Sequence, residues 1–165
     1  MARHAEESRQ TYSCGDEQSH SGGHEKMTDS ESLELQGAVV ARLRSWPDLT
    51  ALVGTKIYDI VPSDTTAPYV EIGDFDDHRD DKTCVSGRLI YVTIHVWTKA
   101  PAGSSRVEAS RIARAVEGAL TEASLTMPSY RLVSLDHTRT QVFKDLDDAH
   151  LHGVVEFTAR TERLS

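Results

Sequence analysis

The chain has 165 residues, of which 38% are hydrophobic, and a formal net charge of −8. This length allows one ordinary domain with a packed core, and the negative charge argues against non-specific nucleic-acid binding, which requires a basic surface. Neither a membrane span nor a secretory signal is present, and the two cysteines, Cys14 and Cys84, do not predict a disulfide framework. We therefore expect an intracellular protein that folds without disulfides.

The N-terminal segment differs in composition from the rest of the chain. Residues 1–26 are rich in Ser, Gly, Glu, Gln and His and contain almost no aliphatic side chains. Such a segment buries too little apolar surface to offset its conformational entropy, so we predict a disordered arm. The remaining residues, 27–165, are predicted to form a single domain, which begins with a capping box from Thr28 to Glu31.

A first helix is predicted from Ser30 to about Ser45, because apolar residues recur there at helical spacing. A short helical turn, Leu49 to Val53, is expected to be capped by Asp48 and ended by Gly54. The apolar stripe of the first helix consists of Leu35, Val39, Leu43 and Trp46.

Two short strands are predicted next, Lys56–Val61 and Tyr69–Asp74, joined by a loop that ends at Pro68. The following segment, Asp74–Gly87, is crowded with charged residues and has no apolar periodicity after Phe75. We predict a long exposed hairpin loop there.

The longest predicted strand is Arg88–Lys99. Because alternate strand residues point to opposite faces, one face is wholly aliphatic and the other is amphipathic and aromatic. Such a strand is expected at the centre of its sheet, with both sides covered. The aliphatic face consists of Ile90, Val92, Ile94 and Val96, and the other of Leu89, Tyr91, Thr93, His95 and Trp97.

A second helix is predicted from a capping box at Ser105–Glu108 to about Ala123. Two long strands follow, Tyr130–Val142 and His150–Thr161, joined by a turn at Asp145–Asp148. The residues of the second helix expected to face the core are Val107, Ile112, Val116 and Leu120.

This order of elements indicates an α+β fold. Strands grouped before and after one helix predict an antiparallel or mixed sheet of about four to five strands, with two main helices packed on one face. In the last strand, Leu151, Val155, Phe157 and Ala159 share the face expected to meet the helices.

Two groups of residues could hold a metal ion. His150, His152 and Glu156 share one strand face, and His95 or His137 could complete a divalent metal site. The acidic loop offers hard oxygen ligands for magnesium or calcium, but it lacks the spacing of a known calcium loop. For both groups we favour a solvated or partner-facing polar surface.

Signatures of enzymes are missing from the sequence. No serine elbow and no phosphate-binding loop is present, and nothing near Cys84 would obviously lower the pKa of its thiol. We therefore predict a protein that is not an enzyme, with no catalytic residues, no cofactor and no metal. A less favoured alternative is a metal-dependent enzyme that uses His150, His152 and Glu156.

Several segments resemble, in order, a family of small tail proteins from long-tailed phages and gene transfer agents. The resemblance runs from about Ser30 to Glu162. It is carried by Trp46–Asp59, Pro62, Pro68–Asp74, Leu89–Thr98 and His152–Glu162.

The resemblance implies a tail terminator, also called a tail completion or head-to-tail joining protein. Such a protein forms a hexameric ring on the head-proximal end of the tail tube, stops tube polymerisation and docks on the head connector, although the isolated chain can be monomeric. The implied partners are the tail tube protein and the head connector or stopper protein, with DNA passing through the lumen without specific binding. The implied location is the bacterial cytoplasm during assembly and then the particle. A head-completion or connector adaptor protein is the alternative.

The residues chosen for an assembly interface come from the acidic loop and from the amphipathic face of the longest strand. Tyr91 and Trp97 would otherwise form a second core layer, and the acidic loop would either line the lumen or dock on a neighbour. The full set is Asp76, Asp77, His78, Arg79, Asp80, Asp81, Tyr91, His95 and Trp97.

Overall fold

The computed structural model describes residues 29–82, 86–100, 106–121, 123–146 and 149–164. Within these ranges the chain forms three helices and one five-stranded mixed sheet, which confirms the predicted α+β class. The predicted arm at 1–26, the caps at Thr28 and Ser105, and both cysteines lie outside the described residues. None of the helices in these ranges is long and apolar enough to cross a membrane.

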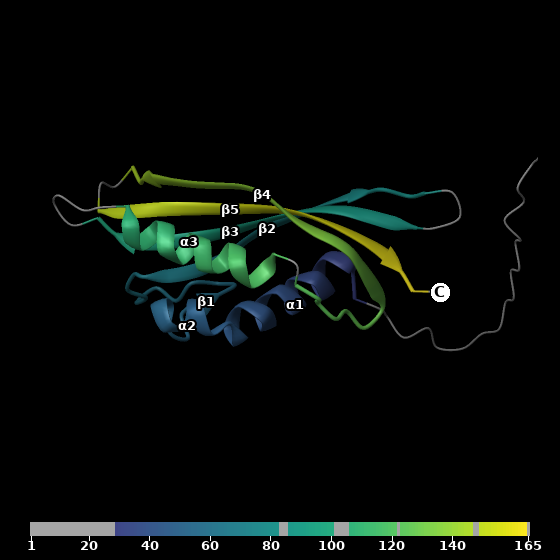
Figure 1. Ribbon diagram of the computed structural model, residues 1–165, viewed down its shortest axis with the longest axis horizontal. Helices are drawn as coiled ribbons and strands as arrows, with labels where there is room; N and C mark the ends of the chain where they lie inside the picture. Colours follow the sequence, from purple (N-terminus) through teal and green to yellow (C-terminus); the bar gives the residue numbers. More distant parts are fainter. Residues whose placement is uncertain (1–28, 83–85, 101–105, 122, 147–148, 165) are drawn as a thin grey trace, which may run out of the picture.

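The sheet has the strand order β1-β2-β3-β5-β4, so the longest predicted strand is indeed central. Apart from the parallel pair of β1 and β2, all neighbours are antiparallel. In Figure 1 the three helices lie on one side of the sheet, which we call the inner face; the opposite side is the outer face. The strands are β1 (Ile57–Tyr58), β2 (Tyr69–Arg79), β3 (Gly87–Lys99), β4 (Tyr130–Lys144) and β5 (His150–Arg163).

Helix α1 (Glu31–Ser45) begins where the backbone N–H of Leu33 donates a 3.3 Å hydrogen bond to the Ser30 hydroxyl. Leu35, Val39 and Leu43 of the predicted stripe are fully buried, whereas its fourth member, Trp46, lies at the C-cap and is only partly buried against the core. Acidic residues lie in its first turn and basic residues in its last turn, and these charges stabilise the helix by interacting favourably with its dipole.

Helix α2 (Pro47–Val53) differs from the prediction at its start. Trp46, not Asp48, occupies the N-cap position, and no side chain caps the helix. Proline suits the first helical position because its missing N–H would have no intrahelical partner there. Gly54 ends the helix with a φ of 63°, as expected for a residue without Cβ.

Helix α3 (Val107–Leu120) is shorter than predicted, since it ends at Leu120 rather than near Ala123. Ile112, Val116 and Leu120 are fully buried, but the expectation for Val107 was wrong because 49% of this residue is exposed. Val107 is the first residue of the helix.

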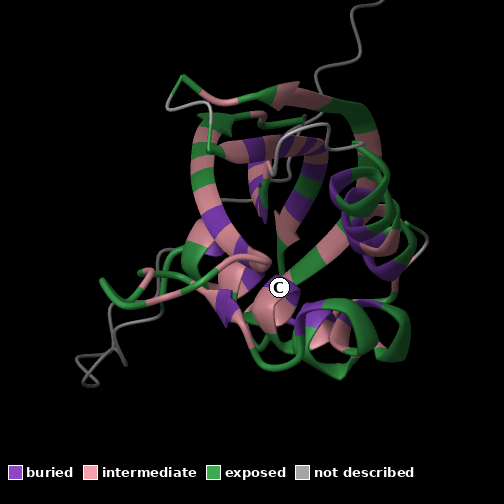
Figure 2. Cartoon of the chain, turned by 90° about the vertical axis from the view of Figure 1, so that its left-hand side faces the viewer, coloured by how far each residue is buried: buried purple, intermediate pink, exposed green. Residues whose placement is uncertain are grey.

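The core joins the helices to the inner face of the sheet. Along the long strands, buried residues alternate with partly buried ones (Figure 2). The aliphatic row of β3 is confirmed, because all four of its side chains belong to the core cluster. They are joined there by Val155, Phe157 and Ala159 of β5 and by the buried stripes of α1 and α3.

The predicted acidic loop is the largest error in the sequence-based assignment of elements. Strand β2 does not end at Asp74 but continues to Arg79, and Phe75–Arg79 pairs with Arg88–Val92. A register shift between Ile72 and Phe75 interrupts the alternation of side chains, so the period-two pattern is lost there. The paired ends of β2 and β3 extend beyond the helices (Figure 1). Strand β1, by contrast, has two residues instead of the predicted six-residue segment.

Candidate assembly interface

A row of ring side chains crosses the outer face of the sheet near one end. The strand register aligns Tyr69 with Trp97, Trp97 with His152, and His152 with Phe143. The centroid of the Trp97 ring lies 3.9 Å from that of His152 and 6.4 Å from that of Tyr69, both stacked, and Phe143 lies 5.0 Å from His152. Tyr58 of β1 extends the row through an edge contact with Tyr69. All five strands thus contribute one ring, and we call this set the aromatic row.

Polar groups in and next to the aromatic row bond to one another. The Trp97 indole N–H donates a 2.8 Å hydrogen bond to Glu71 Oε2. His152 Nε2 and His95 Nδ1 are 2.9 Å apart and share a hydrogen bond. This network is half-buried, so its donors and acceptors are paired as buried polar groups normally are.

Gly73 allows β2 to approach the histidine pair. A Cβ at this position would lie 2.7 Å from His95 Nε2 and 2.8 Å from the Thr93 carbonyl oxygen. Both distances are shorter than van der Waals contact, so only glycine fits here without a shift of the neighbouring strand.

The surroundings of His152 favour its neutral imidazole. Burial, followed by the nearby His95, lowers the pKa of His152 from its ordinary value of 6.5, although Asp145 and Glu71 act in the opposite direction. In the shared hydrogen bond one ring nitrogen donates and the other accepts. Full protonation of both rings would remove the acceptor and bring two positive charges together.

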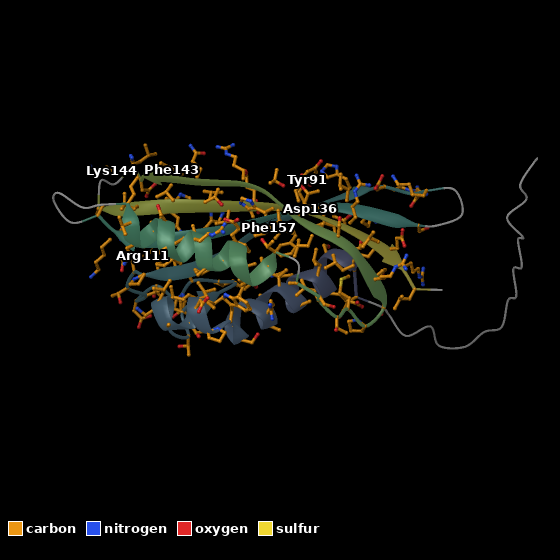
Figure 3. All side chains as sticks on the ribbon, in the orientation of Figure 1. Tyr91, Arg111, Asp136, Phe143, Lys144 and Phe157 are labelled. Carbon is orange, nitrogen blue, oxygen red and sulfur yellow. The ribbon has the colours of Figure 1, made fainter. Side chains whose placement is uncertain are left out.

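The acidic segment of β2 forms a second group toward the other end of β3. On the outer face, Asp76 bonds to His78 at 2.9 Å, and the His78 ring makes an edge contact with Tyr91 at 5.4 Å. Tyr91 and Phe143 project on the side of the sheet away from the helices (Figure 3).

The carboxylates that follow β2 are neutralised by basic neighbours. Asp80 accepts hydrogen bonds from Lys82 and Arg160, each at 2.7 Å, and Asp81 pairs with Arg79. These hydrogen bonds hold the pKa of each of the two carboxyl groups below its ordinary value. The segment therefore forms a network of local ion pairs rather than a run of unpaired negative charges.

Asp77 faces the helices instead of the outer surface. Its Oδ1 lies 3.6 Å from an Arg88 guanidinium nitrogen, and Arg88 donates a 3.1 Å hydrogen bond to Glu31 of α1. Burial raises the pKa of Glu31, and the bond from Arg88 opposes this effect. This triad ties α1 to the sheet and is not available as outer surface.

The structure thus separates the nine predicted interface residues into groups. His95 and Trp97 lie in the aromatic row and its network, whereas Asp76, His78 and Tyr91 form a second outer cluster. Asp77 lies on the inner side, and Arg79, Asp80 and Asp81 form the ion pairs at the hairpin end. Five residues that join these groups were not predicted as interface residues, because their alignment depends on strand register: Tyr58, Tyr69, Glu71, Phe143 and His152.

Two members of the hypothetical metal set meet, namely His95 and His152. Glu156 lies instead beside Arg139, 3.8 Å from its Nε, and His137 bonds to Thr140 at 2.8 Å. Among the described residues, no three metal-ligating side chains gather in one place.

These features define a small α+β protein with a central mixed sheet and a half-buried aromatic and histidine-bearing outer face. The family model described as "Tail completion protein gp17" matches residues 37–162, and the chain belongs to this family. The matched range includes every strand except the last residue of β5, and most of α1.

Individual relatives agree with this assignment. The chain is 30% identical over 125 residues to the tail completion protein gp17 of Bacillus phage SPP1, covering 76% of this chain and 90% of the relative. A chain from the virion of a native gene transfer agent particle is similar in structure, with a TM-score of 0.71, 33% identity, and coverage of 78% and 94%. A structure of bacteriophage SPP1 gp17 has a TM-score of 0.50, 28% identity, and coverage of 81% and 91%.

Proposed function

We propose that this protein is a tail terminator that forms a hexameric ring on the head-proximal end of a tail tube, stops its polymerisation and joins it to the head connector. The observation that carries the proposal is the match of residues 37–162 to the tail completion family. The role is structural, with no catalytic step, cofactor or metal.

The similar chain from a gene transfer agent particle supports a place in an assembled particle. The protein would be made in the bacterial cytoplasm and would then enter the particle, where its partners are further copies of itself, the tail tube protein and the connector. The acidic balance of −8 suits a DNA conduit, because a lumen that repels phosphate lets DNA pass without sticking.

The outer face of the sheet is the surface that assembly would use. A half-buried aromatic row is typical of the centre of protein interfaces, and exposed polar residues are typical of their rim. On this basis His95 and Trp97 contribute to the centre, and Tyr91 contributes to the rim with the hairpin residues other than the inward-facing Asp77, namely Asp76, His78, Arg79, Asp80 and Asp81.

Electron microscopy of particles from cells that lack this gene tests the proposal. Without a terminator, tails should be of irregular length and should fail to join heads. Tails of normal, fixed length that still carry heads would contradict it.

The position of the protein in the particle distinguishes a tail terminator from the alternative, a connector adaptor. A tag at the C-terminus should appear at the tail end of the joint in complete particles. Density one layer nearer the capsid would favour the adaptor.

A further inference from the structure

The two edges of the sheet carry backbone groups that no strand in the described part of the chain pairs with. Strand β1 covers only Val70 and Glu71 of β2, so the edge from Gly73 to Arg79 is open. Strand β4 is the other edge, and its residues 139–143 bond to β5 on one side only. No backbone hydrogen bond to another described element reaches either open stretch.

An uncovered edge is a template for another strand. Natural proteins usually blunt such edges with bulges, and both strands contain register shifts: β2 between Ile72 and Phe75, and β4 at two places before Thr140. Beyond these shifts both edges are regular. Residues 75–79 pair one for one with β3, and residues 139–143 pair one for one with β5. Each edge therefore keeps a straight segment of similar length.

The strand directions allow the two edges to pair in a head-to-tail arrangement. Neighbouring strands from β2 through β3 and β5 to β4 are all antiparallel, so β4 runs opposite to β2. A copy placed beside β4 in nearly the same orientation would present its β2 edge antiparallel to β4. Antiparallel pairing requires no crossover and would continue the sheet from one copy to the next.

The charges on the two edges are opposite. The open part of β2 carries Asp74, Asp76 and Asp77 against one arginine, Arg79. Strand β4 carries Arg131, Arg139 and Lys144 against one aspartate, Asp136. Opposite charges on neighbouring strands stabilise a pair of strands, and like charges destabilise it.

Two of these residues are placed to meet across such a junction. Asp76 and Arg139 both lie on the outer face, since their register partners are Tyr91 and Glu156. Their side chains remain 68% and 58% exposed, respectively. Among the described residues, the Asp76 carboxylate bonds to His78 alone. The guanidinium of Arg139 contacts Glu156 and Gln141, which leaves further donors of this group for a partner.

We propose that the copies in the ring join edge to edge, with the 139–143 segment of β4 in one copy pairing antiparallel with the acidic 75–79 segment of β2 in the next. The inference rests on the ring proposed above and adds how its subunits meet. The occupant of each edge is a second copy of this chain.

Photo-cross-linking tests the junction directly. Gln141 is replaced by p-benzoylphenylalanine in the full chain, and purified particles are irradiated and analysed by mass spectrometry of cross-linked peptides. The expected product links residue 141 of one copy to a peptide containing residues 75–79 of another. The same probe at Arg111, an exposed residue on the helix side (Figure 3), is the matched control and should not give this product.

Each other outcome of the cross-linking overturns the junction. Cross-links from residue 141 to the tube, to the connector or to another segment of this chain assign the β4 edge to a different partner, and the absence of any cross-link shows that the edge is uncovered. Tail length in cells lacking the gene is measured separately. If the expected cross-link is absent but tails in cells lacking the gene lose their fixed length, edge pairing is wrong and the terminator function stands. If the cross-link forms but tail length is unchanged, edge pairing stands and the terminator function is wrong.

Charge reversal gives a second test, which does not depend on the exact register between the two strands. Arg139→Glu and Asp76→Arg should each weaken every junction about fivefold and lower incorporation into particles. Co-expression of the two variants should restore incorporation. In a ring that alternates the two variants, the introduced glutamate of one copy meets the introduced arginine of the next, and the following junction restores the natural pair. Arg111→Glu, the same reversal away from both edges, should incorporate normally.

Circular dichroism verifies that each purified variant is folded before the comparison. Folded single variants that incorporate normally, or a mixture that remains as poor as either variant, would contradict edge pairing, as would an equal loss for Arg111→Glu.

Discussion

The two faces of the central strand β3 differ in what holds their side chains in place. On the inner face, Ile90, Val92, Ile94 and Val96 have at most 1% exposure and belong to the apolar core cluster. On the outer face, Tyr91 remains 45% exposed, while His95 and Trp97 are held by a stacked ring and hydrogen bonds. One face is ordered by burial, and the other by specific directional contacts.

This difference separates stability from assembly. Hydrophobic burial is non-directional and tolerates little water, so the inner face should control whether the chain folds. The outer network fixes aromatic side chains in one arrangement without fully burying them, and under the proposed assembly role this order would reduce the entropy cost of binding a partner. Substitutions on the two faces should therefore have different consequences.

Ile94→Asp should have the largest effect. The change places a carboxylate in a fully buried aliphatic row without a partner, at a cost of several kcal/mol, so the folded state should be lost. Circular dichroism and urea denaturation measure this. Tyr91→Asp introduces the same group on the outer face of the same strand and should retain a cooperative transition; equal loss in both variants would show that the two faces are equivalent.

Trp97→Ala should have an intermediate effect. It removes the ring stacked between Tyr69 and His152 and leaves Glu71 without its indole donor. We expect a loss of about 2 to 3 kcal/mol in the free energy of unfolding, less than for a fully buried tryptophan. Urea denaturation of this variant and of Trp97→Phe provides the measurement. Trp97→Phe retains a ring and should lose less, and equal losses would show that stacking contributes nothing.

His152 should make the stability of the protein sensitive to acid. Because the folded-state pKa of His152 is lowered from 6.5, the unfolded chain binds the proton more readily than the folded protein. This contribution is fully present above pH 6.5 and is lost as the pH falls through that value toward the folded pKa. Urea denaturation at a series of pH values should show the decline.

His152→Gln is the matched variant for this measurement. It should be less stable than the natural chain near neutral pH, and its stability should change less with pH over the same window. Titration of the carboxylates at lower pH affects both proteins, so the difference between the two curves isolates the histidine. Parallel curves would mean that His152 binds protons equally well in both states.

The inner face of β3 could be predicted from the sequence because period-two alternation is a local property of the chain. The hairpin end of β2 could not, since the register shift places Ile72 and Phe75 on the same face three residues apart and removes the pattern. Pairing with Arg88–Val92 supplies backbone hydrogen bonds that do not require apolar side chains. A charged strand in such a position has the composition of a loop.

The aromatic row and its hydrogen-bond network were predicted only in part for a similar reason. His95 and Trp97 were found on their own strand, but His152 and Phe143 join them through pairings between strands distant in sequence. Strand β4 contains two register shifts, so its side chains cannot be assigned to faces by counting. Register depends on the whole sheet and becomes visible only in three dimensions.

Deletion of residues 1–26 should have the smallest effect, and it asks whether the outer face is covered from within the chain or by a partner. The composition of this arm offers almost no aliphatic surface, so we propose that it does not contribute to the folded domain. The truncated protein should unfold at nearly the same temperature and should retain the tryptophan fluorescence maximum of the full chain. A large fall in the unfolding temperature, or a red shift that persists in a Trp46→Phe background and therefore reports on Trp97, would show that the arm shields the outer face. The aromatic row would then be a second core layer rather than a surface awaiting another subunit.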